Sequence, residues 1–318
     1  MKNFTFLIFL TFSSILIAQN ENEDLAVFNK AEAVYNLIYE DFDIQYELDH
    51  LDTTMVEEKI EYELLKEMKS SILERSLEYY EELIDNYPNS KLLYRAINNA
   101  ALISNQLDYK DEAIEYYNQI LNSEANDKEE GGVGSGLMAE PYALYKNRAA
   151  KSLAEIYISQ EKFNKALEYI DLTNKYPYQH FCGNEYAADE IYIATLYTKA
   201  YLGLGKVNEG LDYSLPHVFF NGLADNSEIL ILALETIKNN FSRKEIDSEL
   251  NKAVKNIKMV NKEDYQVGTV TLFGRNIQLP DDSFITYTNE NDLNEIENLS
   301  KKENYQRIFK NSKFYKNL

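Results

Sequence analysis

Small residues recur at fixed intervals along the middle of this chain, and this periodicity restricts the fold more than any other feature. From Ser71 to about Lys258, apolar residues lie three and four positions apart, the spacing that gives a helix one apolar face. Three sets of residues share the same internal separations, twelve and then four: Ala101, Ala113 and Tyr117; Ala154, Ala166 and Ile170; Thr198, Gly210 and Ser214. Each set spans a polar turn, so we expect three pairs of helices that cross closely through small side chains.

The composition agrees with an all-α fold. The 318 residues include 5 Pro and 11 Gly, too few for a turn-rich β-sandwich or for the glycine loops of a nucleotide-binding fold. With 45% apolar side chains, the chain has enough apolar surface to bury a core. The single cysteine excludes an internal disulfide and any metal site with several thiolate ligands.

The paired helices resemble the tetratricopeptide repeat (TPR) family over about residues 71–219. The run Tyr87-Pro88-Asn89-Ser90 is also similar to unit endings in members that assemble envelope machinery. The resemblance implies a solenoid of stacked helix hairpins, which we place at residues 70–258. An irregular helical bundle is the alternative, because alanines at helical spacing line the core of any such fold.

The repeat spacing departs from the regular unit of about 34 residues. No tryptophan occurs, and the small residues at 76, 113, 166 and 210 are 37, 53 and 44 positions apart. We therefore expect inserts between the units. The largest lies at residues 122–137, where glycines are too frequent for a helix, and it is predicted to be a mobile surface loop. Residues 230–241 and 244–257 are expected to form a last, capping helix pair.

The first residues predict an export signal. Lys2 precedes an apolar run from Phe4 to Ile17, and a polar, acidic stretch follows Ala18. The 14 residues of this run reach only about 21 Å as a helix, less than the roughly 30 Å of a hydrocarbon core. We therefore interpret residues 1–18 as a signal peptide, with an uncleaved anchor as the alternative. The expected product is periplasmic or secreted, without an integral membrane span and without a lipid anchor, since the only cysteine is Cys182.

Residues 19–69 form a separate acidic region, with 15 Asp and Glu against 4 Lys. Two or more helices are expected there, near residues 24–48 and 54–86. A solvated polar helix face is the simpler interpretation of the charge, and a dock for a basic partner or divalent cations is the alternative. The whole chain has a net charge of -21, which disfavours binding to nucleic acid or anionic lipid.

The apolar period changes to two beyond Asn261, which predicts a β-hairpin in the C-terminal region, residues 259–318. The strands are expected at 269–273 and 276–279, around a turn at Gly274-Arg275. The predicted cross-strand pairs are Leu272 with Ile277 and Val270 with Leu279. A possible third strand lies at residues 283–287, and residues 301–318 return to a basic helical tail. This region is too short for an independent large fold, so we expect it to pack against the helices before it.

A search for catalytic and metal-binding motifs finds no zinc-protease helix, Walker phosphate loop, nucleophile elbow or Cys-x-x-Cys pair. Asp41-Phe42-Asp43 and Asn289-Glu290-Asn291-Asp292 lack the Gly and terminal Glu of a calcium loop. His180, Cys182 and His217 are potential metal ligands, but loop histidines beside a buried cysteine are the simpler interpretation. We predict no metal, no cofactor and no catalytic residues.

The 26 tyrosines are a possible carbohydrate platform, but many of them lie at the spacing of helix seams. Tyr116, Tyr157 and Tyr197 are examples. We interpret most tyrosines as packing residues whose hydroxyl groups reach the surface.

The first helix of each pair carries a second stripe of residues, away from its small anchor. If the anchors face the core, these stripes line a concave groove. Their members lie three or four residues apart: Arg95, Asn98, Leu102 and Asn105; Arg148, Lys151 and Glu155; Tyr192, Thr195 and Lys199. Four cations and two amides suit extended peptides with acidic side chains or a free carboxylate, as the resemblance implies for the carboxylate-clamping members. An ordinary polar helix face is the simpler alternative.

These features predict a non-catalytic, exported adaptor that binds extended segments of envelope or extracellular proteins. The alternative is an enzyme, or the regulator of one, that acts on cell wall or glycans through a pair of carboxylates where the solenoid meets the C-terminal region. A nutrient-capture component of the outer membrane is a third possibility, opposed by the missing lipid cysteine and the short chain.

Charge reversal at Arg148 and Lys151 is expected to weaken the binding of a natural peptide partner by about tenfold or more, because attraction becomes repulsion in the groove. Fluorescence anisotropy with the labelled partner peptide measures this change. Unchanged affinity would show that these two residues do not line the binding surface.

Overall fold

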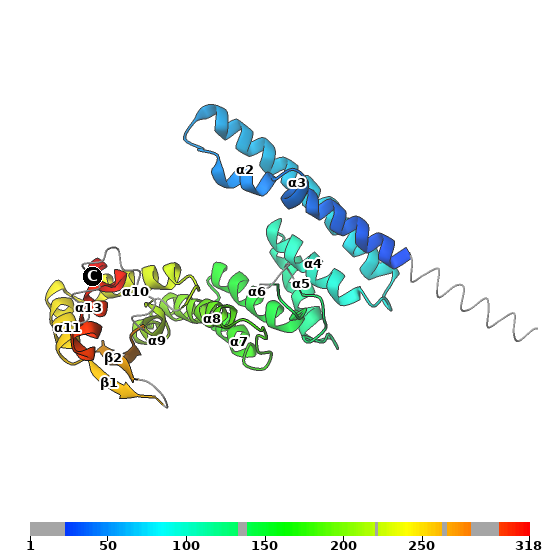
Figure 1. The fold of residues 1–318 in the computed structure, drawn as a ribbon. Helices are drawn as coiled ribbons and strands as arrows, with labels where there is room; N and C mark the ends of the chain where they lie inside the picture. The colour runs from blue at the N-terminus through cyan, green and yellow to red at the C-terminus, as the bar shows by residue number, and fades with distance from the viewer. Residues whose placement is uncertain (1–22, 133–138, 220–221, 263–265, 281–298) are drawn as a thin grey trace, which may run out of the picture. The chain divides into compact units, whose positions relative to one another are not determined.

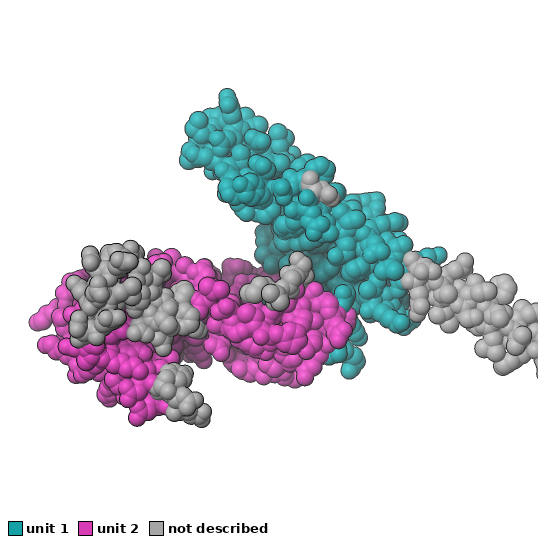
Figure 2. All heavy atoms as spheres, in the orientation of Figure 1, with its two compact units in different colours: residues 1–127, 148–152 teal, residues 128–147, 153–318 magenta. Residues whose placement is uncertain are grey.

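The computed structural model describes residues 23–132, 139–219, 222–262, 266–280 and 299–318. Over these residues the chain is mostly helical and carries one antiparallel sheet of three strands (Figure 1). The expectation of a helical chain with a small C-terminal β element is therefore confirmed. The chain divides into two compact units, residues 1–127 with 148–152 and residues 128–147 with 153–318 (Figure 2).

Unit 1 is built from helices. A helix over residues 23–36 continues into the π-helical turn η1 (Leu37–Asp41), and α2 (Ile44–His50), the long α3 (Val56–Asn86), α4 (Leu93–Gln106) and α5 (Lys110–Leu121) follow. The helical stretches expected near 24–48 and 54–86 are therefore confirmed. The expected region boundary between residues 69 and 70 falls inside α3. This helix ends before Tyr87, because the following Pro88 disfavours helical backbone at the residue before it.

The core of unit 1 lies between the helix at 23–36, the second half of α3 and α4. All buried residues of α3 lie in this half: Leu73, Ser76, Leu77, Tyr80 and Leu83. The Ser76 hydroxyl donates to the Ala31 carbonyl at 2.9 Å, and the Tyr80 hydroxyl donates to the Glu32 carboxylate. Burial and the nearby Glu32 charge raise the pKa of Tyr80. The first half of α3 extends beyond this core with α2 beside it (Figure 1).

Three helix pairs are joined by the same turn. The pairs are α4 with α5, α6 (Tyr145–Ser159) with α7 (Phe163–Leu172), and α8 (Gly183–Gly203) with α9 (Val207–Ser214). Each turn has one residue with left-handed backbone, namely Asp108 (φ 64°), Glu161 (φ 57°) and Gly205 (φ 71°). Each also has the six-to-one bond of a Schellman motif, with the next N–H donating to the carbonyl five residues before it: Tyr109 to Ser104 at 2.8 Å, Lys162 to Tyr157 at 2.8 Å and Lys206 to Tyr201 at 2.9 Å.

The predicted anchors are buried at matching places around these turns. Ala101, Ala154 and Thr198 are each 0% exposed, and each lies seven residues before the left-handed residue of its turn. The second anchors, Ala113, Ala166 and Gly210, lie five residues after it and are also buried. The prediction that these small residues are buried is therefore confirmed, and in the third pair the Thr198 hydroxyl lies 3.5 Å from the Gly210 carbonyl.

Tyrosines pack at equivalent positions in the last two pairs, within unit 2. Tyr157 stacks on Tyr169 with ring centroids 5.3 Å apart, and Tyr201 stacks on Tyr213 at 5.6 Å, both with an angle of 18° between the rings. The Tyr197 hydroxyl donates to the Asp171 carboxylate at 2.5 Å. Tyr157 and Tyr197, predicted as seam residues, are thus packing residues, and a carboxylate binds the hydroxyl group of Tyr197.

Unit 2 continues from the last of these pairs to a mixed helical and β-sheet end. The elements after α9 are η3 (Leu215–His217), α10 (Ser227–Asn240), α11 (Arg243–Lys255), β1 (Lys258–Asn261), β2 (Gln266–Leu272), β3 (Arg275–Gln278), α13 (Lys301–Asn311) and α14 (Lys313–Asn317). The expected last helix pair is confirmed by α10 and α11. The third strand is β1, which pairs with β2, whereas the segment at 283–287 lies outside the described residues.

The glycine-rich insert is non-helical over its described part, residues 122–132, as predicted. Two backbone bonds fasten this part to the segment that precedes α6: Gly131 N–H donates to the Pro141 carbonyl at 3.3 Å, and Ala143 N–H donates to the Glu129 carbonyl at 2.8 Å. The described end of the insert is therefore tied to the segment before α6. The predicted mobility of the loop stays a prediction, because residues 133–138 lie outside the described part of the chain.

The C-terminal hairpin forms, but its predicted register is wrong by two residues. Val270 faces Ile277, and Leu272 faces Arg275. The turn therefore lies at Phe273-Gly274, whose φ angles of 47° and 84° fit a type I′ turn. Because side chains alternate with a period of two, this shift keeps the predicted residues on the buried face.

Contacts from distant helices explain the register. The Phe273 N–H donates to the Glu249 carboxylate of α11 at 2.7 Å. Arg275 Nε donates to the Asp212 carboxylate of α9 at 2.7 Å. These contacts place Phe273 in the turn and Arg275 in the strand, and none of them follows from the local sequence of the hairpin.

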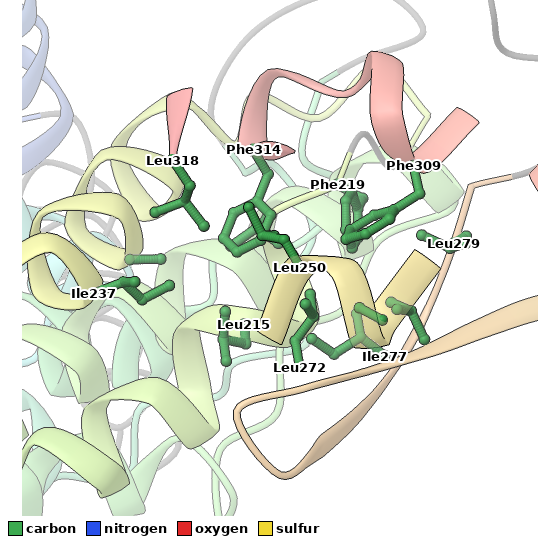
Figure 3. Close-up of a cluster of buried hydrophobic side chains, with 14 of the residues drawn as sticks. Leu215, Phe219, Ile237, Leu250, Leu272, Ile277, Leu279, Phe309, Phe314 and Leu318 are labelled. Carbon is green, nitrogen blue, oxygen red and sulfur yellow. The ribbon is translucent and has the colours of Figure 1, made fainter. Parts of the chain in front are cut away.

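One core joins the C-terminal region to the helices before it (Figure 3). Leu215, Ile237 and Leu250 come from η3, α10 and α11, and they meet strand residues on one side and the last helices on the other. The strand and tail residues of this core include Leu272, Ile277, Leu279, Phe309, Phe314 and Leu318. The prediction that this region packs against the preceding helices is confirmed.

Gly268 of β2 allows α13 to approach the sheet closely, since a Cβ at this position would lie 2.4 Å from Tyr305 Cγ. We expect Gly268→Ala to lower the free energy of unfolding of unit 2 by about 1–3 kcal/mol, because the ring and the strand must separate. Thermal unfolding followed by circular dichroism measures this loss. Gly183→Ala is the matched control, since a Cβ there meets no atom within 4 Å. Equal melting temperatures for Gly268→Ala and the unchanged protein would contradict the expectation.

Candidate functional site

The residues of the predicted groove lie on the helices expected for them. Arg95, Asn98 and Asn105 are on α4, Arg148, Lys151 and Glu155 are on α6, and Tyr192, Thr195 and Lys199 are on α8. The α4 residues belong to unit 1 and the α8 residues to unit 2. The structure therefore gives the local surroundings of each residue, while the groove itself stays a prediction.

Thr195 was wrongly placed on an open face. It is 3% exposed, and its hydroxyl donates to the Ile191 carbonyl of the same helix at 2.8 Å. The reason is that α8 packs against α7, α9 and α10, so more than one of its faces is covered. Periodicity along α8 alone does not show how many neighbours the helix has.

Several other groove residues already have partners within the chain. Lys199 Nζ lies 2.6 Å from the Glu228 carboxylate. The side-chain oxygen of Asn105 accepts a hydrogen bond from Lys110 Nζ at 2.8 Å. A peptide that bound these two side chains would have to replace existing contacts, which reduces the gain in free energy.

A different surface stands open on the first half of α3. Val56, Ile60 and Leu64 are 75%, 58% and 62% exposed, and Met68 continues the same spacing of four residues. We call these four residues the apolar stripe. Val56, Ile60 and Leu64 line a shallow groove of about 470 Å³ together with Lys59, Glu63 and Glu67. Positions four apart form a continuous ridge on a helix, so the stripe is one surface and not four scattered side chains.

The start of α3 is set by a local turn. Asp52 accepts hydrogen bonds from the Thr54 N–H at 3.0 Å and from the Thr54 hydroxyl at 2.7 Å, and these bonds lower the pKa of Asp52. The Asp52 N–H donates to Glu58 at 2.6 Å, which places a carboxylate in the first helical turn. Negative charge there is favourable next to the positive end of the helix dipole.

α2 covers the opposite side of this part of α3. The buried Ile44 and the half-buried Leu48 of α2 pack in the same cluster as Leu65 of α3. Lys69 of α3 donates a hydrogen bond to Gln45 of α2. α3 thus has two apolar faces in its first half, and α2 satisfies one of them.

The apolar stripe was not predicted, because the many charges of residues 19–69 favour a solvated polar face. The signal was present at positions 56, 60, 64 and 68, beside a second apolar series at 62, 65, 69 and 72, where Lys69 contributes its aliphatic stem. A helix with two such series has more apolar surface than one neighbour can cover.

The enzyme alternative predicted a carboxylate pair where the C-terminal region meets the helices. A cavity of about 760 Å³ does lie there, lined by Glu245, Glu249, Lys252 and Arg275 among others. The Glu245 carboxylate accepts from the Ser242 hydroxyl and N–H, which lowers its pKa, and Glu249 accepts from Phe273. Each carboxylate thus has a structural contact of its own, Glu245 at the cap of α11 and Glu249 at the turn of the hairpin.

Both nitrogens of the His180 ring are used within the chain. Nδ1 accepts from the Cys182 N–H at 2.9 Å, which places the proton on Nε2, and Nε2 lies 3.0 Å from the Ala139 carbonyl that accepts it. This arrangement fits the simpler interpretation of a structural histidine. Among the residues that the structure describes, no group of three or more His, Cys, Asp or Glu side chains gathers around a possible metal position.

No protein family matches the sequence, and no curated protein matches it. The TPR resemblance therefore stays a prediction. In the described parts of the chain, every helix is too short or too polar to span a lipid bilayer.

His217 is half-buried at the end of η3, and burial lowers its pKa although the Glu190 charge acts in the opposite direction. The unfolded chain, with a histidine pKa of about 6.5, then binds more protons than the folded chain as the pH falls toward this value. We expect stability to decrease below about pH 6.5 and His217→Gln to remove part of that decrease.

Urea unfolding at about pH 7.5 and about pH 5.5, above the range in which carboxylates titrate, measures this effect. His50→Gln, at an exposed position on α2, is the matched control. If the difference in stability between the two pH values is the same for His217→Gln and the unchanged protein, the assignment to His217 is wrong.

Proposed function

We propose that this chain is a non-catalytic, exported adaptor that binds other proteins through the apolar stripe. The exposure of Val56, Ile60 and Leu64 in one continuous row is the observation that carries this proposal. Soluble proteins expose scattered apolar side chains freely, but a contiguous row rimmed by charges is typical of an interaction surface.

The residues of the stripe lie outside the buried core of their own unit. The buried residues of α3 all come from Leu73 onward, and α2 covers the face of α3 that carries Leu65. Substitutions in the stripe should therefore change stability little, since surface changes away from the core have effects of about 0.5 kcal/mol or less. This separation allows binding to be tested without unfolding the protein.

The helix pairs and the predicted groove are part of the same adaptor. We propose that the three helix pairs stack in a TPR-like solenoid and that the predicted groove residues on α4, α6 and α8 offer a second, weaker contact for a peptide. Thr195 is removed from this set because it is buried. Export by the leader at residues 1–18, and a periplasmic or secreted location, belong to the same proposal.

The double variant Ile60→Glu, Leu64→Glu is expected to bind its main partner protein about tenfold or more weakly, because two carboxylates would have to be buried in the complex. Affinity capture from the native envelope fraction, with quantification by mass spectrometry, measures the loss. Phe181→Glu is the matched control, since Phe181 is 82% exposed in unit 2. Circular dichroism checks that both variants are folded.

The outcome that contradicts this function is specific. If the double variant captures the same proteins in the same amounts as the unchanged chain, the stripe is not the binding surface. If the Phe181→Glu control loses the partner equally, the effect comes from added charge rather than from the stripe.

A further inference from the structure

We infer that the partner segment bound by the apolar stripe is an amphipathic helix with basic flanks, an inference that rests on the proposed function. The geometry of α3 favours a helix over an extended strand. Within α3 the N–H and C=O groups bond to each other, so they are not available to add a strand. A partner must therefore be recognised by side chains.

The apolar stripe has the form that a helix can match. Its residues lie four apart, so they form a ridge with a groove beside it, and ridges of a second helix pack into such grooves. The distance along the helix from Val56 to Met68 is about 18 Å, from 1.5 Å per residue. A partner helix of about three to four turns covers this length.

The charges beside the stripe indicate the sign of the charge that the partner must have. On the helix surface Glu63 and Glu67 flank the stripe on one side, and Glu57 and Glu61 flank it on the other. All four residues are exposed, and within the described residues their side chains form no ion pair. Lys59 is the one cation that lines the groove there.

The wider surroundings of the stripe also have a negative charge. Residues 39–69, which include α2 and the first half of α3, hold 11 Asp and Glu against 3 Lys. The negative potential of this surface would attract a helix with Lys or Arg on both flanks, and these cations would lie beside the exposed carboxylates. An acidic or neutral helix with the same apolar face would lack this attraction.

The same charges oppose two other occupants. A second copy of the chain would bring an identical acidic rim against the first, and the whole chain already has a net charge of -21. An anionic membrane would repel the rim as well. A basic helix is the partner that satisfies both the apolar ridge and the glutamates.

A pair of synthetic peptides tests the inference. Both carry the same leucines at helical spacing over 18 residues, one with Lys and Arg on its flanks and the other with Glu. Fluorescence anisotropy with the full chain is expected to show binding of the basic peptide about tenfold or more tighter than the acidic one. Raising the salt concentration from about 50 mM to about 500 mM should weaken the binding of the basic peptide several-fold, because the charges are screened.

Variants of the chain show where the peptide binds. Ile60→Glu with Leu64→Glu should weaken the binding of the basic peptide by about tenfold or more, and Phe181→Glu should leave this binding unchanged. Glu63→Lys with Glu67→Lys should raise affinity for the acidic peptide and lower it for the basic one. This reversal is a result that a purely apolar contact would not give.

Four results would overturn the inference: no binding of the basic peptide, equal binding of both peptides, binding that survives the Ile60→Glu, Leu64→Glu change, or an unchanged preference in the Glu-to-Lys variant. Sedimentation equilibrium that shows a dimer lost in the stripe variant would assign the surface to a second copy. Binding to phosphatidylglycerol vesicles that depends on the stripe would assign it to a membrane.

These results are distinguishable from a failure of the proposed function. If capture of native partners depends on the stripe but neither peptide binds, the adaptor function stands and the basic helix is wrong. If the basic peptide binds as expected but the stripe variant captures native partners as well as the unchanged chain does, the inferred preference for a basic helix is correct and the adaptor function is wrong.

Discussion

Close approach of helices through small, fully buried side chains underlies the paired helices of this protein. Ala101, Ala154 and Thr198 have no exposed surface, and each is followed at the same distance by a left-handed turn residue. Larger side chains would force the helices apart, because protein interiors are packed as densely as organic crystals. The constant distance from anchor to turn explains why tyrosines stack at equivalent places in the last two pairs.

The first half of α3 is not packed in this way. α3 has about twice the length that its core requires, and its first half carries an apolar series on each of two faces. α2 packs on one face, which leaves the apolar stripe in water at a cost in solubility that the surrounding glutamates reduce. The buried core and the exposed stripe therefore lie at different ends of the same helix.

The C-terminal region depends on docking. A two-stranded hairpin is marginally stable by itself, and the three-stranded sheet gains stability from the shared core with η3, α10, α11 and the last helices. Capping boxes at Ser242 and Ser300 fix the starts of α11 and α13. Arg275 then ties the hairpin to α9 through Asp212, in a contact that joins residues far apart in the sequence.

Sequence alone determined the features that depend on neighbours along the chain. The positions of the helices, the buried anchors, the polar turns and the period of two in the hairpin follow from backbone preference and periodicity. Tertiary structure decided which face of each element was covered. Thr195 is buried because α8 has several neighbours. The stripe is exposed because α2 covers the other side of α3. In the hairpin, the observed register is the one in which Phe273 contacts Glu249 and Arg275 contacts Asp212. A helix or strand carries its own pattern of apolar residues, but the partner that covers this pattern comes from elsewhere in the fold.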